Sequence, residues 1–192
     1  MLAFPDLTAP LRSAGAELRF ATERDIPEIL IAHQDDPLLY LRLGLERPPS
    51  GAELGRRSDT EAALRHAGDQ VRFTILTPGS DVCRGQLHVH RVDWDDRRAE
   101  AGIWVAPQAR GRGLAPAALR LAGAWLFDRC GLARLELLTE PDNAAMIAAA
   151  RGAGLTEEGV LHAYLRERGR RLDVAVLSLL PADLDPDGTD PP

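Results

Sequence analysis

A glycine-rich segment with two arginines is the part of this chain whose residue types and spacing best suit chemistry. It reads Gln108-Ala-Arg-Gly-Arg-Gly-Leu-Ala115, follows an apolar run that ends in Ile103-Trp-Val105, and precedes a long helical pattern. A glycine-rich turn between a strand and a helix points several backbone N–H groups in one direction, toward which the helix dipole is also positive. The glycines allow the backbone to approach a ligand closely. The segment therefore predicts a binding site for a pyrophosphate.

Other glycine-rich turns fit these residues less well. A dinucleotide-binding turn needs a third glycine, and in that frame the third position is Pro116. A Walker loop ends in Gly-Lys followed by Ser or Thr, and this chain contains no lysine. A simple turn with scattered arginines stays open as the plain alternative.

Glu100 is the first candidate for acid–base chemistry. It lies between Ala99 and Ala101 at the start of an apolar strand, where burial would raise the pKa of a carboxyl group. The alternatives are an exposed edge carboxylate and an ion pair with Arg97 or Arg98.

His88 and His90 are weaker candidates. They lie two residues apart and so share one face of their strand. They could act as a base or contact an acceptor, although paired histidines on a strand are more often ordinary half-buried residues. A third ligand with metal-binding spacing is absent from the sequence around them.

These residues must be positioned by alternating short strands and helices. Thr22 is expected to cap the first helix, with Asp25 completing a capping box, and Pro48-Pro-Ser-Gly51 marks a break. We expect strands over residues 18–21, 71–76, 84–92, 99–105, 133–139, 160–166 and 171–179. We expect helices from Thr22 to about His33, over 37–45, from Asp59 or Thr60 onward, over 114–129 and over 144–151.

With its flanking strand and helix, the glycine-rich segment resembles the acetyl-CoA signature of the GNAT superfamily of N-acetyltransferases. The resemblance covers roughly residues 17–180 and includes further motifs of the family. These are the opening strand and helix at Leu18–Ile26, the fourth strand at Ala99–Val105, the fifth strand at Leu132–Leu138, and Asn143 with its helix and Gly154-Leu155.

The resemblance implies an α/β (α+β) GNAT fold, with a mixed, mostly antiparallel sheet flanked by helices on both faces. The fourth and fifth strands would be parallel and joined by the helix over residues 114–130. We expect residues 1–16 to form a loose N-terminal arm and residues 17–180 a single acetyltransferase domain. Residues 181–192, which are acidic and rich in proline, are expected to be disordered.

The resemblance also implies acetyl-CoA as the cosubstrate, with no metal. Backbone groups of the fourth strand would bind the pantetheine arm, and a backbone N–H near Val105 would stabilise the oxyanion. Asn143 would contact the cofactor where the two strands separate, although it is equally suited to cap a helix. The implied cofactor-binding residues are Ile103, Trp104, Val105, Gln108, Arg110, Gly111, Arg112, Gly113, Leu114, Ala115 and Asn143.

The chain departs from the family at one catalytic position. Many members carry a tyrosine seven residues after the asparagine, where it protonates the leaving thiolate, and here that position is Ala150. Water, Tyr164 or Cys130 could substitute, and the sequence selects none of them.

The implied function is acetyl transfer from acetyl-CoA to a primary amine by direct attack in a ternary complex. The segments Arg19–Asp25, Trp104-Val105 and Gly169–Asp173 resemble the subgroup related to ribosomal-protein N-terminal acetyltransferases, which implies a protein N-terminus or a small-molecule amine as acceptor. Two alternatives stay open: a non-catalytic acyl-CoA-binding or sensing module, which Ala150 favours, and a dinucleotide-binding oxidoreductase, which Pro116 disfavours.

Bulk properties agree with a single enzyme domain of 192 residues. A net charge of −6 and a pI near 5.4 disfavour binding to nucleic acid or to an anionic membrane. The two cysteines give no metal spacing or disulfide framework, and the N-terminal residues lack the basic and apolar regions of a secretion signal. We expect a cytoplasmic protein, and a homodimer is compatible with the sequence.

Overall fold

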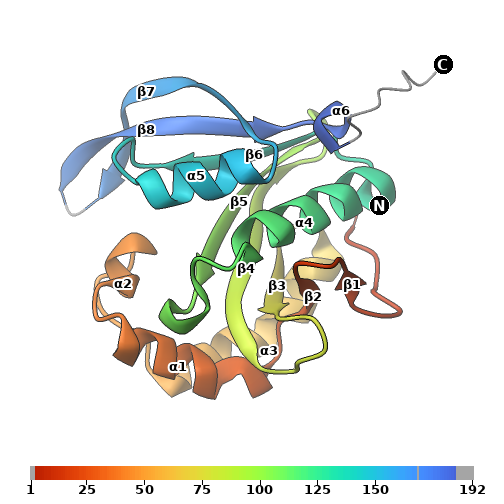
Figure 1. Cartoon of the computed structure of the whole chain (residues 1–192), viewed down its shortest axis with the longest axis vertical. Coiled ribbons are helices and arrows are strands. Elements are labelled where there is room, and N and C mark those ends of the chain that lie inside the picture. The colour runs from red at the N-terminus through yellow and green to blue at the C-terminus, as the bar shows by residue number, and fades with distance from the viewer. Residues whose placement is uncertain (1–2, 168, 185–192) are drawn as a thin grey trace.

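The computed structural model describes residues 3–167 and 169–184. Within these residues, eight strands form one sheet in the order β1-β2-β3-β4-β5-β6-β8-β7 (Figure 1). The strands are β1 (Leu11–Arg12), β2 (Glu17–Phe20), β3 (Val71–Leu76), β4 (Cys83–Asp93), β5 (Arg98–Val105), β6 (Arg134–Thr139), β7 (Thr156–Glu167) and β8 (Arg170–Leu179).

One parallel pair lies in an otherwise antiparallel sheet. β5 and β6 are parallel, and the other neighbouring strands pair antiparallel. The crossover between the parallel strands is the long helix α4 (Leu114–Cys130). The predicted mixed sheet with this crossover is therefore confirmed.

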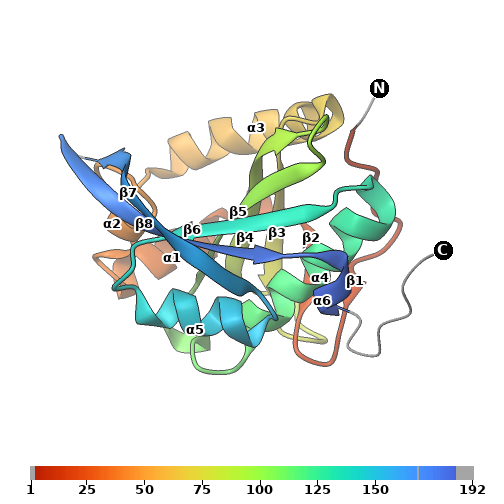
Figure 2. The ribbon, with the colours of Figure 1, turned by 90° about the horizontal axis from the view of Figure 1, so that it is seen from above.

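Helices cover both faces of the sheet. α4 and α5 lie on one side, and α3 lies on the other side, where α1 packs against it (Figure 2). The remaining bounds are α1 (Ile26–Asp35), α2 (Leu39–Arg42), α3 (Gly51–Ala67), α5 (Ala144–Gly152) and α6 (Pro181–Leu184), with 3₁₀ turns at Glu23–Asp25 and Pro107–Ala109.

Alternation along β5 separates an apolar face from a polar face. Ala99, Ala101 and Ile103 are buried in the main core together with the apolar stripe of α4. Because successive side chains of a strand point to opposite faces, Glu100 and Trp104 lie on the other face, which α1 and α3 cover. The face that carries Glu100, called the polar face below, also holds a smaller apolar cluster in which Trp104 packs against Ile29 and Leu54.

The segment expected to be a loose arm over residues 1–16 is packed in its described part. Leu11–Arg12 forms β1 against β2, and Phe4 is only 1% exposed. The Phe4 ring lies 6.0 Å from that of Trp125 on α4 and 5.3 Å from that of Trp94. Burial of one aromatic side chain, which stabilises by roughly 1.5–3 kcal/mol, holds this segment to the domain.

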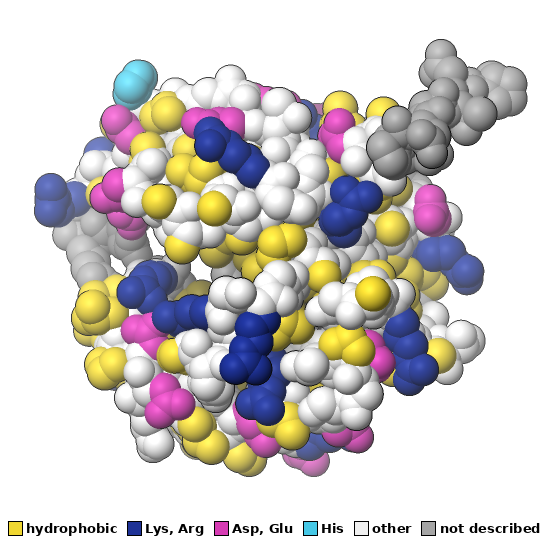
Figure 3. Space-filling model, viewed as in Figure 1, with side chains coloured by type: hydrophobic (Ala, Val, Ile, Leu, Met, Phe, Trp, Pro, Cys, Tyr) yellow, Lys and Arg dark blue, Asp and Glu magenta, His cyan; other side chains and the backbone are white. Residues whose placement is uncertain are grey.

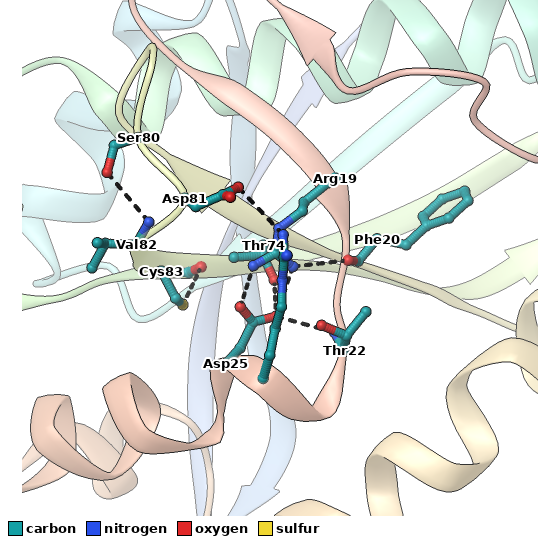
Figure 4. A network of polar contacts seen from close by, with 11 residues as sticks. Arg19, Phe20, Thr22, Asp25, Thr74, Ser80, Asp81, Val82 and Cys83 are labelled. Atoms are coloured by element: carbon teal, nitrogen blue, oxygen red, sulfur yellow. Dashed lines mark hydrogen bonds and ion pairs between the residues drawn. The ribbon is translucent and has the colours of Figure 1, made fainter.

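A buried ion pair fixes the corner between β2 and α1 (Figure 4). The Asp25 carboxylate accepts hydrogen bonds from Arg19 Nη1 at 3.0 Å, the Thr74 hydroxyl at 2.6 Å and the Thr22 backbone N–H at 3.0 Å. Burial alone would raise the pKa of Asp25, but the bonds from Arg19 and Thr74 outweigh it and hold the pKa below its ordinary value. The bond from the Thr22 N–H to the Asp25 carboxylate is the one that the predicted capping box requires.

The third helix begins earlier than predicted. α3 starts at Gly51 instead of Asp59 or Thr60, because Ser50 and Glu53 form a capping box. The Ser50 hydroxyl accepts the Glu53 N–H at 3.3 Å, and the Glu53 carboxylate accepts the Ser50 N–H at 2.8 Å. At the other end of the chain, the first four residues of the predicted disordered tail form α6, and residues 185–192 lie outside the described residues.

Candidate active site

The glycine-rich segment forms a turn between β5 and α4. After Val105 the chain makes a short 3₁₀ turn and then places Gly111 and Gly113 at φ values of 71° and 75°. These left-handed values cost little only for glycine. A Cβ atom on either glycine would meet no other atom within 4 Å, so the space beside both residues is open.

The turn presents a run of free backbone donors. Among the described residues, the N–H groups of Gly111, Arg112, Gly113, Leu114 and Ala115 donate no hydrogen bond, and Pro116 has no N–H. Pro116 therefore removes no donor that the helix needs. Five consecutive amides at the positive end of a 17-residue helix fit a pyrophosphate.

The side chains of the turn point in different directions. Arg112 and Gln108 are exposed and line a hollow of about 600 Å³ together with Arg84. Their side chains form no hydrogen bond or ion pair with the described residues. Arg110 turns back instead, because its guanidinium bonds the Val105 carbonyl and the Asp36 carboxylate. The backbone N–H of Arg110 also donates to the Pro107 carbonyl oxygen at 3.3 Å. In this arrangement the guanidinium and the backbone N–H of Arg110 both have partners within the protein, and a contact between Arg110 and the cofactor stays a prediction.

β5 and β6 separate directly beside this turn. Their parallel pairing covers only Arg98–Arg134, Ala99–Leu135 and Glu100–Glu136. Within residues 3–167 and 169–184, β5 has no strand partner on that side from Ala101 onward. This unpaired stretch includes the expected pantetheine-binding residues Ile103, Trp104 and Val105. The molecular surface is hollowed between the regions of α5 and α2, with basic side chains gathered over α2 and the turn (Figure 3).

Asn143 caps α5 at the far side of the separation. Its Oδ1 accepts the Met146 N–H at 3.2 Å, and its Nδ2 donates to the Thr139 hydroxyl at 3.0 Å. The helix-capping alternative for Asn143 is confirmed. A contact between Asn143 and a cofactor stays a prediction.

A second hollow, of about 610 Å³, opens on the polar face at the last β5–β6 pair. Glu100 and Glu136 line it together, with Tyr164 of β7 and Trp94 beside them. Glu136 is not among the predicted site residues, although it lies between two leucines much as Glu100 lies between two alanines. That shared pattern of one carboxylate within an apolar strand is the signal that could have found it.

Glu100 is held by two basic groups. Its side chain is 16% exposed and accepts a hydrogen bond from Arg91 Nη1 at 2.8 Å, and His90 Nε2 lies 3.7 Å from its other oxygen. Arg91 has a φ of 50° in a bulge of β4, which gives this contact its local backbone geometry. The expected pair with Arg97 or Arg98 does not form.

The two histidines lie on the same face, as predicted, with ring centroids 4.8 Å apart. His88 Nε2 lies 3.0 Å from Gln70 Oε1. Burial, followed by the nearby charge of Arg72, lowers the pKa of His88 to about 2. An imidazole with so acidic a conjugate acid cannot take a proton from an ammonium group. Burial also lowers the pKa of His90, against the opposing charge of Glu100.

Ala150 is fully buried in the main core, beside Ala153 and Leu155. A tyrosine ring at this position would need volume that the core does not provide. Tyr164 is instead 47% exposed and lines the hollow that contains Glu100.

Two further findings concern the whole described part of the chain. No helix in residues 3–167 and 169–184 is long and apolar enough to cross a membrane. No group of three or more His, Cys, Asp or Glu side chains in those ranges is arranged to hold a metal ion.

Comparisons with known proteins agree on one family. A family model described as an acetyltransferase (GNAT) domain matches residues 16–156. YdaF of Bacillus subtilis (strain 168), described as a candidate ribosomal N-acetyltransferase, is 30% identical over 134 residues, which are 69% of this chain and 72% of YdaF. The spermidine N(1)-acetyltransferase of Escherichia coli (strain K12) is 31% identical over 99 residues, which are 50% of this chain and 52% of that enzyme.

Solved structures extend the likeness to nearly the whole fold. Mycobacterium smegmatis RimJ in complex with CoA-disulfide has a TM-score of 0.75 and 26% identity, over 92% of this chain and 88% of RimJ. Coverage of the relatives found by sequence varies: the chain spans 64% of the length of p20 of Bacillus licheniformis and 92% of the length of YoaA of Bacillus subtilis (strain 168).

Proposed function

This chain belongs to the GNAT acetyltransferase family, and we propose that it transfers the acetyl group of acetyl-CoA to a primary amine by direct attack in a ternary complex. The observation that carries the proposal is the run of five free amides, Gly111 to Ala115, beside the point where β5 and β6 separate. Acetyl-CoA supplies the activated acetyl group. The protein's residues bind it, orient the amine and remove a proton.

The turn and β5 would hold the cosubstrate. The free amides would bind the pyrophosphate, and Arg112 and Gln108 could reach its oxygens from the exposed side of the turn. Backbone groups of Ile103 and Trp104 lie on the unpaired edge of β5, where a pantetheine amide could bond them. The structure of RimJ in complex with CoA-disulfide supports the same class of ligand.

The hollow on the polar face would hold the acceptor. Glu100 and Glu136 meet there on neighbouring strands, although each is paired with an arginine. With Asp93 and Asp95, four carboxylates and two arginines line the hollow, and this excess of negative charge favours a cationic amine. Glu100 is our candidate general base, because the pKa of His88 is too low for the role. His90 contacts Glu100 and is next in line.

We propose a peptide N-terminus as the acceptor and a polyamine as the second choice. The names of YdaF and of the spermidine enzyme support one choice each. The two cysteines, Cys83 and Cys130, are free thiols, which suits a reaction in the reducing cytoplasm.

A non-catalytic acyl-CoA-binding module is the second candidate function. Ala150 favours it, because many family members have a tyrosine at this position as the general acid. Here the position is a buried alanine, which cannot donate a proton. The exposed Tyr164 and water in the hollow weaken this argument, since either could supply the proton.

Thiol release from acetyl-CoA in the presence of an amine panel tests the proposal. The panel should hold peptides with free N-termini, spermidine, and the same peptides with blocked N-termini as controls. We expect release with one amine class and none with blocked peptides. Tight CoA binding by calorimetry without release on any amine would support the binding module, and no CoA binding would overturn both functions.

A further inference from the structure

Asp36 joins three parts of the site through one carboxylate. It follows α1, is 9% exposed, and its Oδ2 accepts Arg110 Nη2 and Arg42 Nη1, each at 2.6 Å. Its Oδ1 accepts the Leu38 N–H at 3.2 Å, directly before α2. Asp36 therefore contacts the glycine-rich turn and α2 at the same time.

Arg110 carries this contact onward to the end of β5. Its Nε donates to the Val105 carbonyl at 2.9 Å, while its Nη2 reaches Asp36. A planar guanidinium that bonds two fixed acceptors sets their separation. The bonded path thus runs from Val105 through Arg110 and Asp36 to Arg42.

The two ends of the path lie on opposite sides of the proposed reaction. The turn and Val105 belong to the proposed cofactor side. α2 packs through Leu39 against Ala106 and Trp104, and Trp104 lies on the polar face that carries Glu100. α2 therefore covers the acceptor side of the sheet, with a single turn of helix that has little stability of its own.

We propose that Asp36 is a positioning residue that couples cofactor binding to the order of α2. A cofactor that fixes the turn would hold Arg110, and through Asp36 it would restrain α2 against Trp104, which lies on the same face of β5 as Glu100. The proposal rests on the proposed function, because it takes the turn as the cofactor site. Coupling of this kind is reciprocal, so an acceptor that orders α2 would also tighten cofactor binding.

Hydrogen exchange of the full chain, with CoA as the probe, tests the coupling without any need for turnover. In the wild type, saturating CoA should slow exchange of the amides at residues 111–115 and also of those at residues 38–43. We expect the α2 effect to be about fivefold or more, the lower end of typical allosteric coupling.

Three variants separate coupling from simple binding. Asp36→Asn keeps the shape of the side chain and removes its charge, and Arg110→Gln breaks the path from a side chain that is 41% exposed, so folding is less at risk. In both, CoA at saturation should still protect residues 111–115 but no longer residues 38–43. Arg24→Gln, which removes an exposed ion pair with Asp81, is the matched control and should behave as the wild type.

The remaining results are equally decisive. Unchanged protection of residues 38–43 in both Asp36→Asn and Arg110→Gln would overturn the coupling. Protection at the turn but never at α2 in the wild type would also overturn it while leaving the proposed function intact. Absence of any protection at residues 111–115 would overturn the proposed function itself.

Steady-state kinetics give a second readout that a merely structural role would not produce. Asp36→Asn should raise the acceptor KM by about fivefold at saturating acetyl-CoA, with a smaller change in kcat. The double variant Asp36→Asn with Arg110→Gln should be no worse than either single variant, because both break the same path. Additive losses would contradict the proposal.

Discussion

Glu100 illustrates how a single side chain can serve two chemical purposes. Its carboxylate lines a hollow that it shares with Glu136, so it can attract an ammonium group. It also has one oxygen 3.7 Å from His90, through which a proton could pass onward. Arg91 holds the carboxylate in place, which keeps it from swinging away when the hollow fills.

Glu100→Gln should lower the rate of acetyl transfer mainly at neutral pH. A general base typically contributes about 10²–10⁴-fold, and at high pH the amine arrives already deprotonated and needs less help. A pH–rate profile of kcat/KM checks this, with Glu157→Gln, an exposed partner of Arg151, as the matched control. A profile that overlays the wild type would move the role to His90.

Tyr164→Phe should keep most of the activity. The residue is 47% exposed, so water has access to the same hollow and can protonate the leaving thiolate. Measurement of kcat at saturating substrates decides the question. A loss of about a hundredfold or more, the scale of a general acid, would mean that Tyr164 has taken the place of the missing tyrosine.

At the scale of elements, the turn before α4 depends on its two left-handed glycines. Gly113→Val should abolish CoA binding, because φ is 75° there and the added methyl groups would stand beside the free amides. The matched control is Gly131→Val at the other end of α4, where φ is 72° and the surrounding space is equally open. Calorimetry should show lost CoA affinity in the first variant only, and equal affinity in both would contradict the assignment.

Elements that carry strong periodicity could be predicted, and contacts between distant segments could not. The alternation in residues 71–76 and the apolar stripe of α4 gave elements that match the structure. The β1 strand is two residues long and leaves no pattern to detect. The Ser50 to Glu53 spacing predicts the start of α3, but Pro48 and Pro49 directly before it indicate a break and obscure this signal.

In the candidate site, too, the local backbone features could be predicted from the sequence, and the contacts between distant residues could not. Backbone features of the turn follow from its glycines, so the free amides at residues 111–115 were predictable. The direction of the Arg110 side chain was not, because its partner Asp36 lies 74 residues away in the chain. The shared hollow of Glu100 and Glu136 likewise depends on the register of β5 against β6.

At the scale of the whole molecule, buried histidines should make the fold sensitive to mild acid. Burial lowers the pKa of His33, His88 and His90 below the ordinary value of 6.5, in the case of His88 to about 2. Below 6.5 the unfolded chain therefore binds protons that the folded chain does not, so stability falls as the pH drops. Asp25 has a lowered pKa instead, and its contribution is lost only below its ordinary value of 3.8.

His88→Gln should flatten this decline. We expect the free energy of unfolding of the wild type to fall between about pH 7 and pH 5, by at most roughly 1.4 kcal/mol per pH unit for each histidine. The variant should lose less over the same range, whatever its stability at pH 7. Urea denaturation at several pH values measures both slopes, and parallel curves would contradict the prediction.

The short ladder between β5 and β6 has a mechanical consequence. Three residue pairs and the crossover α4 join one leaf of the molecule, built on β1 to β5, to a second leaf built on β6, β8 and β7. Beyond those pairs β5 and β6 separate, so the two parts are joined at one end of the strands and open at the other. A molecule bound between them that bonds the free edge of β5 would add a second connection between the two parts, along the line where we place the ligand.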